Sequence, residues 1–285
     1  MTLLIPPRVQ DIGFTVKRLL PSRLQQRVGP FIFVDHMGPA QFELGTTADD
    51  VRQHPHIGLA TVTYLFSGAM MHKDSLGFHQ RIEPGAINLM TAGNGIVHSE
   101  RLPEDIRAGS IPVEGMQIWL ALPTEVEDCE PSFAHYPKDI IPSINLPTMS
   151  AQVLIGNAFG VESPVKTASA TTYLDLALGA GTRYVPDFPG QELAVYVAWG
   201  TVTVNGEDVP EFHLAVLDEN AVIETDHDAR IFLLGGEPLA GERFISWNFV
   251  ASSRDKVQAA GERWITGGFA MVPGEIDFIP LPGGA

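Results

Sequence analysis

Cysteine is almost absent from this chain: its 285 residues contain one, Cys129. A single thiol cannot close an internal disulfide, and it cannot supply the thiolate cluster of a structural zinc or iron–sulfur site. We therefore interpret Cys129 as a structural or incidental thiol, so any metal site has to do without a cluster of cysteine ligands.

Long hydrophobic runs are also missing. No stretch reaches the roughly 18 consecutive apolar residues that a membrane-spanning helix requires. Residues 1–10 lack the basic and apolar regions of a secretory signal. We expect a soluble, cytoplasmic protein that does not insert into a membrane.

Positive charge is scarce, because 18 Lys and Arg residues face 34 Asp and Glu residues and leave a formal net charge of -16. Such a surface repels phosphate backbones and anionic headgroups, so we expect no direct nucleic-acid binding. The sequence also lacks a G-x-S-x-G turn and a P-loop, and Gly93-Asn94-Gly95 opens no predicted helix. Hydrolase and nucleotide-binding functions are therefore disfavoured.

Glycine and proline are frequent: the 28 glycines and 22 prolines are distributed along the chain and separate short apolar runs. This rhythm is typical of all-β proteins. We predict one helix, at Ser253 to Trp264, where a serine precedes apolar residues spaced by three and four. The predicted strands include Pro30–Val34, Leu59–Phe66, Ala86–Met90, Met116–Leu122, Thr171–Leu178, Leu193–Val197, Thr201–Val204, His213–Leu217, Ala221–Glu224 and Arg230–Leu234.

The strands fall into two blocks, at residues 29–123 and 171–235, separated by a proline-bearing stretch at 123–147. A chain of this length suits two domains of about 100–200 residues. Many short strands, present twice over, indicate two small barrels or jelly rolls. We predict an N-terminal domain at 1–135 and a C-terminal domain at 136–285, as diverged copies of one fold.

Two pairs of polar residues stand out for their spacing. His54 and His56 form an H-x-H pair, and His98 and Glu100 form an H-x-E pair 42 residues further on. Alternate side chains of an extended strand project to the same face, so each pair presents two metal ligands in one direction. Separately satisfied core or loop histidines are the alternative.

The same alternation of side chains can be followed along the sequence after His56. The even-numbered positions from Ala60 to Phe66 are apolar, whereas Thr61 and Thr63 are polar. This pattern predicts that the histidine face is the inward face, where an unpaired polar ring costs about 1 to 3 kcal/mol. A bound metal would satisfy the four polar groups together.

Longer runs carry a resemblance to a known family. The runs are HPHIG at 54–58, TVTYL at 61–65, HKDSLG at 72–77 and above all MTAGNGIVHSE at 90–100. GPFIFVDHMGP at 29–39, MQIWLALP at 116–123, LGGEP at 234–238 and VPGEIDFIPLP at 272–282 agree with them. These runs closely resemble the pirin family of the cupin superfamily, and because they are spread from residue 29 to residue 282 the similarity covers nearly the whole chain.

The resemblance implies a bicupin, in which two antiparallel jelly-roll β-barrels pack together with one or two short peripheral helices. It also implies a metal site in the N-terminal barrel alone, with His54, His56, His98 and Glu100 as ligands. Those four residues are the ones that the spacing indicates. Pirins are usually iron proteins, and three imidazoles with one carboxylate suit Fe(II), although they also accept Mn, Co, Ni, Cu or Zn.

The sequence departs from the common family pattern beside the first histidine pair. Many pirins read H-P-H-R-G-F-E-T, whereas Ile57, Leu59 and Ala60 replace the Arg, Phe and Glu here. These replacements change the surroundings of the ligands, which tune redox potential and substrate choice. The C-terminal barrel has His213 and His227 but no H-x-H pair, so we expect it to be metal-free.

Other histidines and aromatic residues carry weaker hypotheses. We interpret His36 as structural, in a turn. We interpret His72 and His79 as solvated loop residues. Tyr64 and Phe66 are most simply core residues on the inward face.

The resemblance implies a metal-dependent dioxygenase with quercetin 2,3-dioxygenase-type activity, acting on a flavonol and O2. In that function Glu100 is also a candidate base for the flavonol hydroxyl. The alternative from the same family is an iron-dependent redox-sensing regulator, whose acidic surface favours a protein partner over DNA. A metal-binding relic with neither role is the third hypothesis, and two packed barrels suit a monomer.

Overall fold

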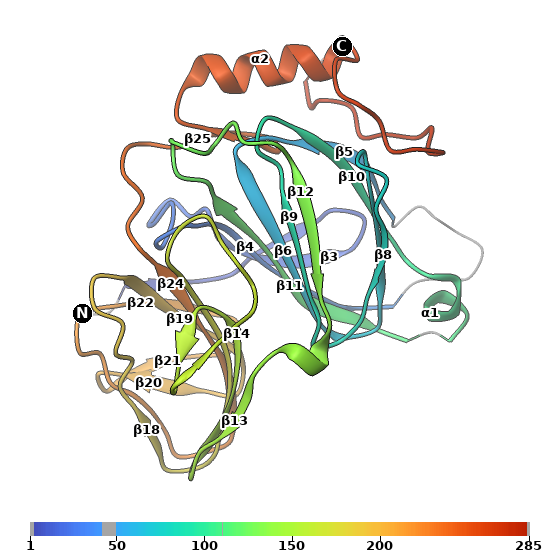
Figure 1. Ribbon diagram of the computed structural model, residues 1–285. Helices are drawn as coiled ribbons and strands as arrows, with labels where there is room; N and C mark the ends of the chain where they lie inside the picture. Colours follow the sequence, from blue (N-terminus) through green and yellow to red (C-terminus); the bar gives the residue numbers. More distant parts are fainter. Residues whose placement is uncertain (1–2, 42–49, 110, 284–285) are drawn as a thin grey trace. The chain divides into compact units, whose positions relative to one another are not determined.

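The computed structural model describes residues 3–41, 50–109 and 111–283, and strands dominate it (Figure 1). The chain divides into two compact units. Unit 1 comprises Met1–Val9, Lys17–Asp35 and Asp139–Leu239, and unit 2 comprises Gln10–Val16, His36–Lys138 and Ala240–Ala285. Each unit is therefore assembled from alternating segments of the sequence.

Three strands and one short 3-10 helix lie where the chain passes between the units: β2 (Arg8–Asp11), β3 (Thr15–Leu20), β4 (Phe31–Ala40) and η1 (Lys138–Ile140). The remaining elements of unit 1 are all strands: β1 (Leu3–Ile5), β13 (Ser143–Asn145), β14 (Met149–Ile155), β15 (Asn157–Ala158), β16 (Val161–Glu162), β17 (Thr171–Leu178), β18 (Thr182–Tyr184), β19 (Glu192–Trp199), β20 (Val202–Val204), β21 (Glu207–Val209), β22 (Leu214–Leu217), β23 (Ile223–Thr225) and β24 (Ala229–Gly236).

Unit 2 adds two helices to its strands. Its elements are β5 (Val51–His56), β6 (Leu59–Ser67), β7 (Met70–Asp74), β8 (His79–Ile82), β9 (Ile87–Thr91), β10 (Ile96–Arg101), α1 (Glu104–Ala108), β11 (Val113–Ala121), β12 (Ser132–Tyr136), β25 (Phe244–Ser246), β26 (Phe249–Ala251) and α2 (Arg254–Ile265).

Unit 1 encloses an aliphatic interior between two antiparallel sheets. The larger sheet has the order β1-β22-β19-β24-β17-β14-β13, and the smaller has the order β18-β23-β20-β21. Val195 and Leu233 of the larger sheet share one buried cluster with Val204 and Ile223 of the smaller sheet. The β-branched residues of these strands suit such a pleated, buried surface.

Unit 2 has the same plan of two sheets. One sheet has the order β5-β10-β7-β8, and the other has the order β12-β9-β6-β11-β4-β3-β2. Met70 and Ile82 of the first sheet pack against Leu65 and Val113 of the second. Helix α2, drawn in red in Figure 1, buries Val257, Ala260 and Trp264 together with Phe249 and Phe269.

The predicted all-β bicupin fold is confirmed. Each of the ten predicted strands overlaps an observed strand, and the predicted helix is α2, whose N-cap Ser253 accepts a hydrogen bond from the Lys256 amide. The division into domains at 1–135 and 136–285 stays a prediction. No helix in the described ranges is both long and apolar enough to cross a membrane.

Candidate metal centre

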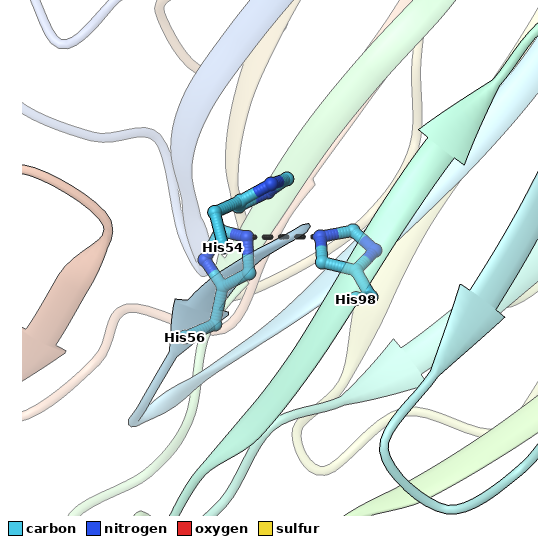
Figure 2. Close-up of side chains that lie close together, drawn as sticks. All are labelled: His54, His56 and His98. Carbon is cyan, nitrogen blue, oxygen red and sulfur yellow. Dashed lines mark hydrogen bonds between the residues drawn. The ribbon is translucent and has the colours of Figure 1, made fainter. Parts of the chain in front are cut away.

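The two polar pairs lie on adjacent antiparallel strands of unit 2. His54 and His56 are on β5, and His98 is on β10, where it pairs directly with His54. Directly opposed residues of an antiparallel pair project to the same face of the sheet. The register therefore brings the three imidazoles together, as Figure 2 shows.

Two glycine turns hold the ends of these strands. Gly58 follows β5 with φ +65°, and Gly93 precedes β10 with φ +50°. A Cβ atom would lie 2.0 Å from the Val250 carbonyl oxygen at the first turn and 1.9 Å from the Cys129 carbonyl oxygen at the second. The Gly58 amide donates to the Gly93 carbonyl at 2.9 Å, so the two turns are tied to one another. Only glycine fits such positions without strain.

The three histidines form a compact and buried group. Each offers a ligand nitrogen, and these nitrogens lie within 4.8 Å of one another. The exposed fractions of His54, His56 and His98 are 6%, 1% and 1%. The Nε2 atoms of His56 and His98 are 3.1 Å apart, the contact that the dashed line marks in Figure 2.

Backbone carbonyls orient two of the rings. His54 Nδ1 lies 2.8 Å from the Arg52 oxygen, and His56 Nδ1 lies 3.1 Å from the Asn248 oxygen. A carbonyl can only accept a hydrogen bond, so each Nδ1 carries the proton and each Nε2 keeps its lone pair. Such outer hydrogen bonds are what fix the tautomer of metal-binding histidines.

Burial keeps the rings uncharged. It lowers the pKa of His54 to about 4, and it lowers the pKa of His56 and of His98 well below the ordinary value of 6.5, with the neighbouring histidines adding to the effect at both. Neutral imidazoles whose unprotonated nitrogens converge in a buried space are the donor set that a divalent metal requires. The residues present therefore fit a metal ion.

Glu100 lies near this group, two residues after His98 on the same face of β10. Its Oε1 atom accepts hydrogen bonds from Thr63 Oγ1 at 3.4 Å and from Gln117 Nε2 at 3.3 Å. Burial raises the pKa of this carboxyl group. Within the described ranges the convergent group consists of the three histidines, so ligation of a metal by Glu100 stays a prediction.

The predicted inward face of β6 is wrong. The Thr63 hydroxyl donates a hydrogen bond to Glu100. Trp119 pairs with Thr61 across the sheet, and the centre of its ring lies 5.1 Å from the centre of the His56 ring. The polar side of β6, not its apolar positions, therefore faces the histidines. The alternation of β5 cannot be continued through the glycine turn into β6, because the two strands belong to different sheets.

The structure also corrects two interpretations of single histidines. His72 is 4% exposed and lies on β7 beside β10, so it is not a solvated loop residue. His79 is exposed, as predicted, but it is the first residue of strand β8 and does not lie in a loop. His36 is structural but lies in strand β4, where its Nε2 is 3.0 Å from Glu114 Oε1. Buried Tyr64 is a core residue, as predicted.

Sequence reasoning missed the role of the C-terminal segment. Glu275 accepts hydrogen bonds from Ser99 Oγ at 2.9 Å and from both Arg101 Nε and Nη2 at 2.8 and 2.7 Å. Gln53 accepts a hydrogen bond from the Val272 amide at 3.0 Å. Gln53, Ser99 and Arg101 thus bind the C-terminal segment from β5 and β10, on the face opposite to that of the three histidines. The alternation of a strand assigns these neighbours to that face, but nothing local in the sequence names Glu275 as their partner.

Comparisons with known proteins agree with this fold. A family model described as Pirin matches residues 13–120, and one described as Pirin C-terminal cupin domain matches residues 173–270. A pirin-like protein of Caulobacter vibrioides is 42% identical over 289 residues, which cover 98% of this chain and 99% of the relative. A Pseudomonas aeruginosa protein with quercetin 2,3-dioxygenase as its provisional name is 38% identical over 260 residues, covering 90% of this chain and 80% of that protein.

A solved structure extends the similarity to three dimensions. Quercetin 2,3-dioxygenase from Acinetobacter baumannii superposes with a TM-score of 0.90 at 34% sequence identity. The match covers 100% of this chain and 96% of the other.

Proposed function

The chain belongs to the pirin family, and from this premise we propose that it is a metal-dependent dioxygenase that opens flavonol rings at a mononuclear iron site. The observation that carries the proposal is the group of three buried, neutral imidazoles whose nitrogens converge within 4.8 Å. The names of the Pseudomonas and Acinetobacter relatives support the reaction class.

We assign the ligands as His54, His56, His98 and Glu100. Three nitrogen donors and one carboxylate suit Fe(II), and the same set accepts other divalent metals of the first transition row. When bound, the metal supplies Lewis acidity that favours the deprotonated 3-hydroxyl of a flavonol and open positions for the reactants.

Glu100 is the residue of this chain that we assign to proton transfer. Its carboxyl group is buried, burial raises its pKa in the metal-free protein, and a carboxylate positioned in this way can act as a general base. Thr63 and Gln117 hold one carboxylate oxygen through their hydrogen bonds, so the other oxygen would bind the metal and, when that bond is weak, accept the proton of the substrate hydroxyl. Removal of that proton makes the flavonol electron-rich enough to react with O2.

The test measures O2 and carbon monoxide together. Protein loaded anaerobically with Fe(II) is mixed with quercetin and a small panel of flavonols, and we expect consumption of O2 and release of carbon monoxide in equal amounts. Glu100→Gln is expected to lower the rate by about 100-fold or more, the usual contribution of a positioned base. His213→Ala in unit 1 is the matched control and is expected to leave the rate unchanged.

One result would contradict the dioxygenase assignment: protein that binds a full equivalent of iron and consumes no O2 with any flavonol of the panel. That result would favour the redox-sensing regulator.

A further inference from the structure

One metal-binding histidine has different support from the other two. The Nδ1 atoms of His54 and His56 face backbone carbonyls, whereas His98 Nδ1 faces another imidazole, the Nδ1 of His72, at 3.4 Å. His72 Nε2 in turn lies 2.9 Å from Asp74 Oδ2. His98 is therefore the first member of a chain of three side chains.

This chain of side chains is built into the sheet. Strand β7 runs beside β10, and its register sets Asp74 opposite His98 and His72 opposite Glu100. The exposed fractions of His72 and Asp74 are 4% and 0%. All of these side chains therefore share the inner face of one sheet and are shielded from water.

The contacts among His98, His72 and Asp74 allow one arrangement of protons that leaves both rings neutral and the carboxylate ionised. A carboxylate accepts, so His72 Nε2 donates to Asp74 and His72 Nδ1 keeps a lone pair. That lone pair accepts a proton from His98 Nδ1, so His98 Nε2 is left unprotonated. This Nε2 lies 3.1 Å from His56 Nε2, which also lacks a proton, so two lone pairs converge where a metal ion would accept both.

We propose that His72 and Asp74 are positioning residues, which hold His98 in the Nδ1-protonated tautomer and present its Nε2 to the metal. The inference rests on the metal site of the proposed function but not on its dioxygenase activity. Neither residue touches the metal in this account; Asp74 acts through His72, and His72 acts through His98.

Packing locks both positioning residues. Asp74 Oδ1 accepts hydrogen bonds from the backbone amides of Leu76 and Phe78 at 3.0 and 3.1 Å, so its Oδ2 is aimed at His72. The His72 ring stacks on Phe133 with the ring centres 4.3 Å apart and the planes inclined by 12°. Neither side chain can rotate away from its partner without breaking these contacts.

The test uses Co(II) as the probe, and it measures the dissociation constant and the visible absorption of the cobalt complex. Asp74→Asn keeps the shape and the Oδ1 acceptor, but its amide donates to His72 Nε2. His72 Nδ1 must then carry the proton, and His98 is driven to the tautomer whose Nε2 cannot bind metal. We expect binding weakened by about 10–100-fold, the usual effect of losing such a partner.

A thermodynamic cycle separates positioning from general damage. His72→Asn retains an acceptor for His98 and loses the contact with Asp74, so Asp74→Asn added to it should weaken Co(II) binding no further. Asp175→Asn, which alters a buried carboxylate of unit 1, is the control and should leave Co(II) affinity unchanged. Melting temperatures of the metal-free variants report the fold separately.

Nitrogen-15 NMR of the metal-free wild type reads the His98 tautomer directly, so the inference is testable even if a variant does not fold. We expect a protonated Nδ1 and an unprotonated Nε2. The reverse tautomer, wild-type affinity in Asp74→Asn, or an undiminished effect of Asp74→Asn in the His72→Asn background would each overturn the inference. Failure of the wild type to bind Co(II) would instead overturn the metal site itself.

Discussion

The two units differ in the chemistry of their interiors, although each is enclosed by two antiparallel sheets. The interior of unit 1 is a cluster of aliphatic residues, among them Leu174, Val195 and Leu233. The corresponding space of unit 2 contains the three histidines and Glu100, all buried. The same architecture thus encloses an apolar core in unit 1, and a polar site beside an apolar cluster in unit 2.

The difference shows what a buried polar site requires of this fold. Each of the four site residues in unit 2 has a specific partner: carbonyls for His54 and His56, His72 for His98, and Thr63 for Glu100. The aliphatic cluster of unit 1 needs no such partners, because aliphatic side chains bury without hydrogen bonds. The polar site therefore requires specific hydrogen-bond partners from several strands. The aliphatic cluster requires only that its side chains fill the space between the sheets.

The largest expected effect is on metal binding by unit 2. His56→Ala removes one of three convergent donors, and we expect metal content of the purified protein to fall from one equivalent to none. Dioxygenase activity should disappear with it. Elemental analysis checks the metal content, and His227→Ala in unit 1 is the matched histidine variant. An equal loss of metal from the two variants would contradict the assignment of the metal site to unit 2.

A core substitution in unit 1 should have the converse effect. Leu233→Ala leaves a cavity in the aliphatic cluster, and we expect the free energy of unfolding to fall by about 2–5 kcal/mol. Metal content per folded chain should stay at one equivalent. Denaturant unfolding measures the stability, and a substantial loss of metal from the folded variant would show that the site depends on the core of unit 1.

Acid should destabilise the metal-free protein through unit 2. The unfolded chain binds a proton at His54 near pH 6.5, whereas the folded chain does so only at about pH 4. Unfolding is therefore favoured as pH falls from 6.5 toward 4, by about 3 kcal/mol from this residue alone. Unfolding curves of the wild type and of His54→Leu at pH 7 and pH 5 isolate the effect. Parallel loss of stability in the two proteins would contradict it.

The smallest expected effect concerns the C-terminal segment of unit 2. Glu275→Gln weakens the bidentate contact with Arg101, and we expect a loss of about 1–3 kcal/mol in the free energy of unfolding, typical of charge-assisted hydrogen bonds. Glu162→Gln, which removes an exposed ion pair with Lys166 in unit 1, should cost under about 1 kcal/mol. Similar losses from both would mean that the segment does not secure the metal-bearing strands.

Much of the fold could be predicted from sequence because most strands are apolar and bounded by glycine or proline. The strands that carry His54, His56 and His98 could not be recognised in the same way. Strand β5 contains Arg52, Gln53 and a proline, and β10 reads IVHSER. Their extended form is maintained by pairing with each other and with β7, which is tertiary context that local propensity does not contain.

The candidate site was predictable for a narrower reason. The spacing of two in H-x-H and H-x-E assigns each pair to one face of a strand, and the structure brings His54, His56 and His98 together. Neither the burial of His72 nor the side of β6 that faces the site could be predicted, because both depend on which sheet a strand joins.

Anomalous diffraction from crystals loaded with Fe(II), collected on both sides of the iron edge, tests the central claim most directly. The account predicts one iron peak per chain, bound to the Nε2 atoms of His54, His56 and His98. A peak elsewhere in the chain, or one bound through Nδ1, would contradict it.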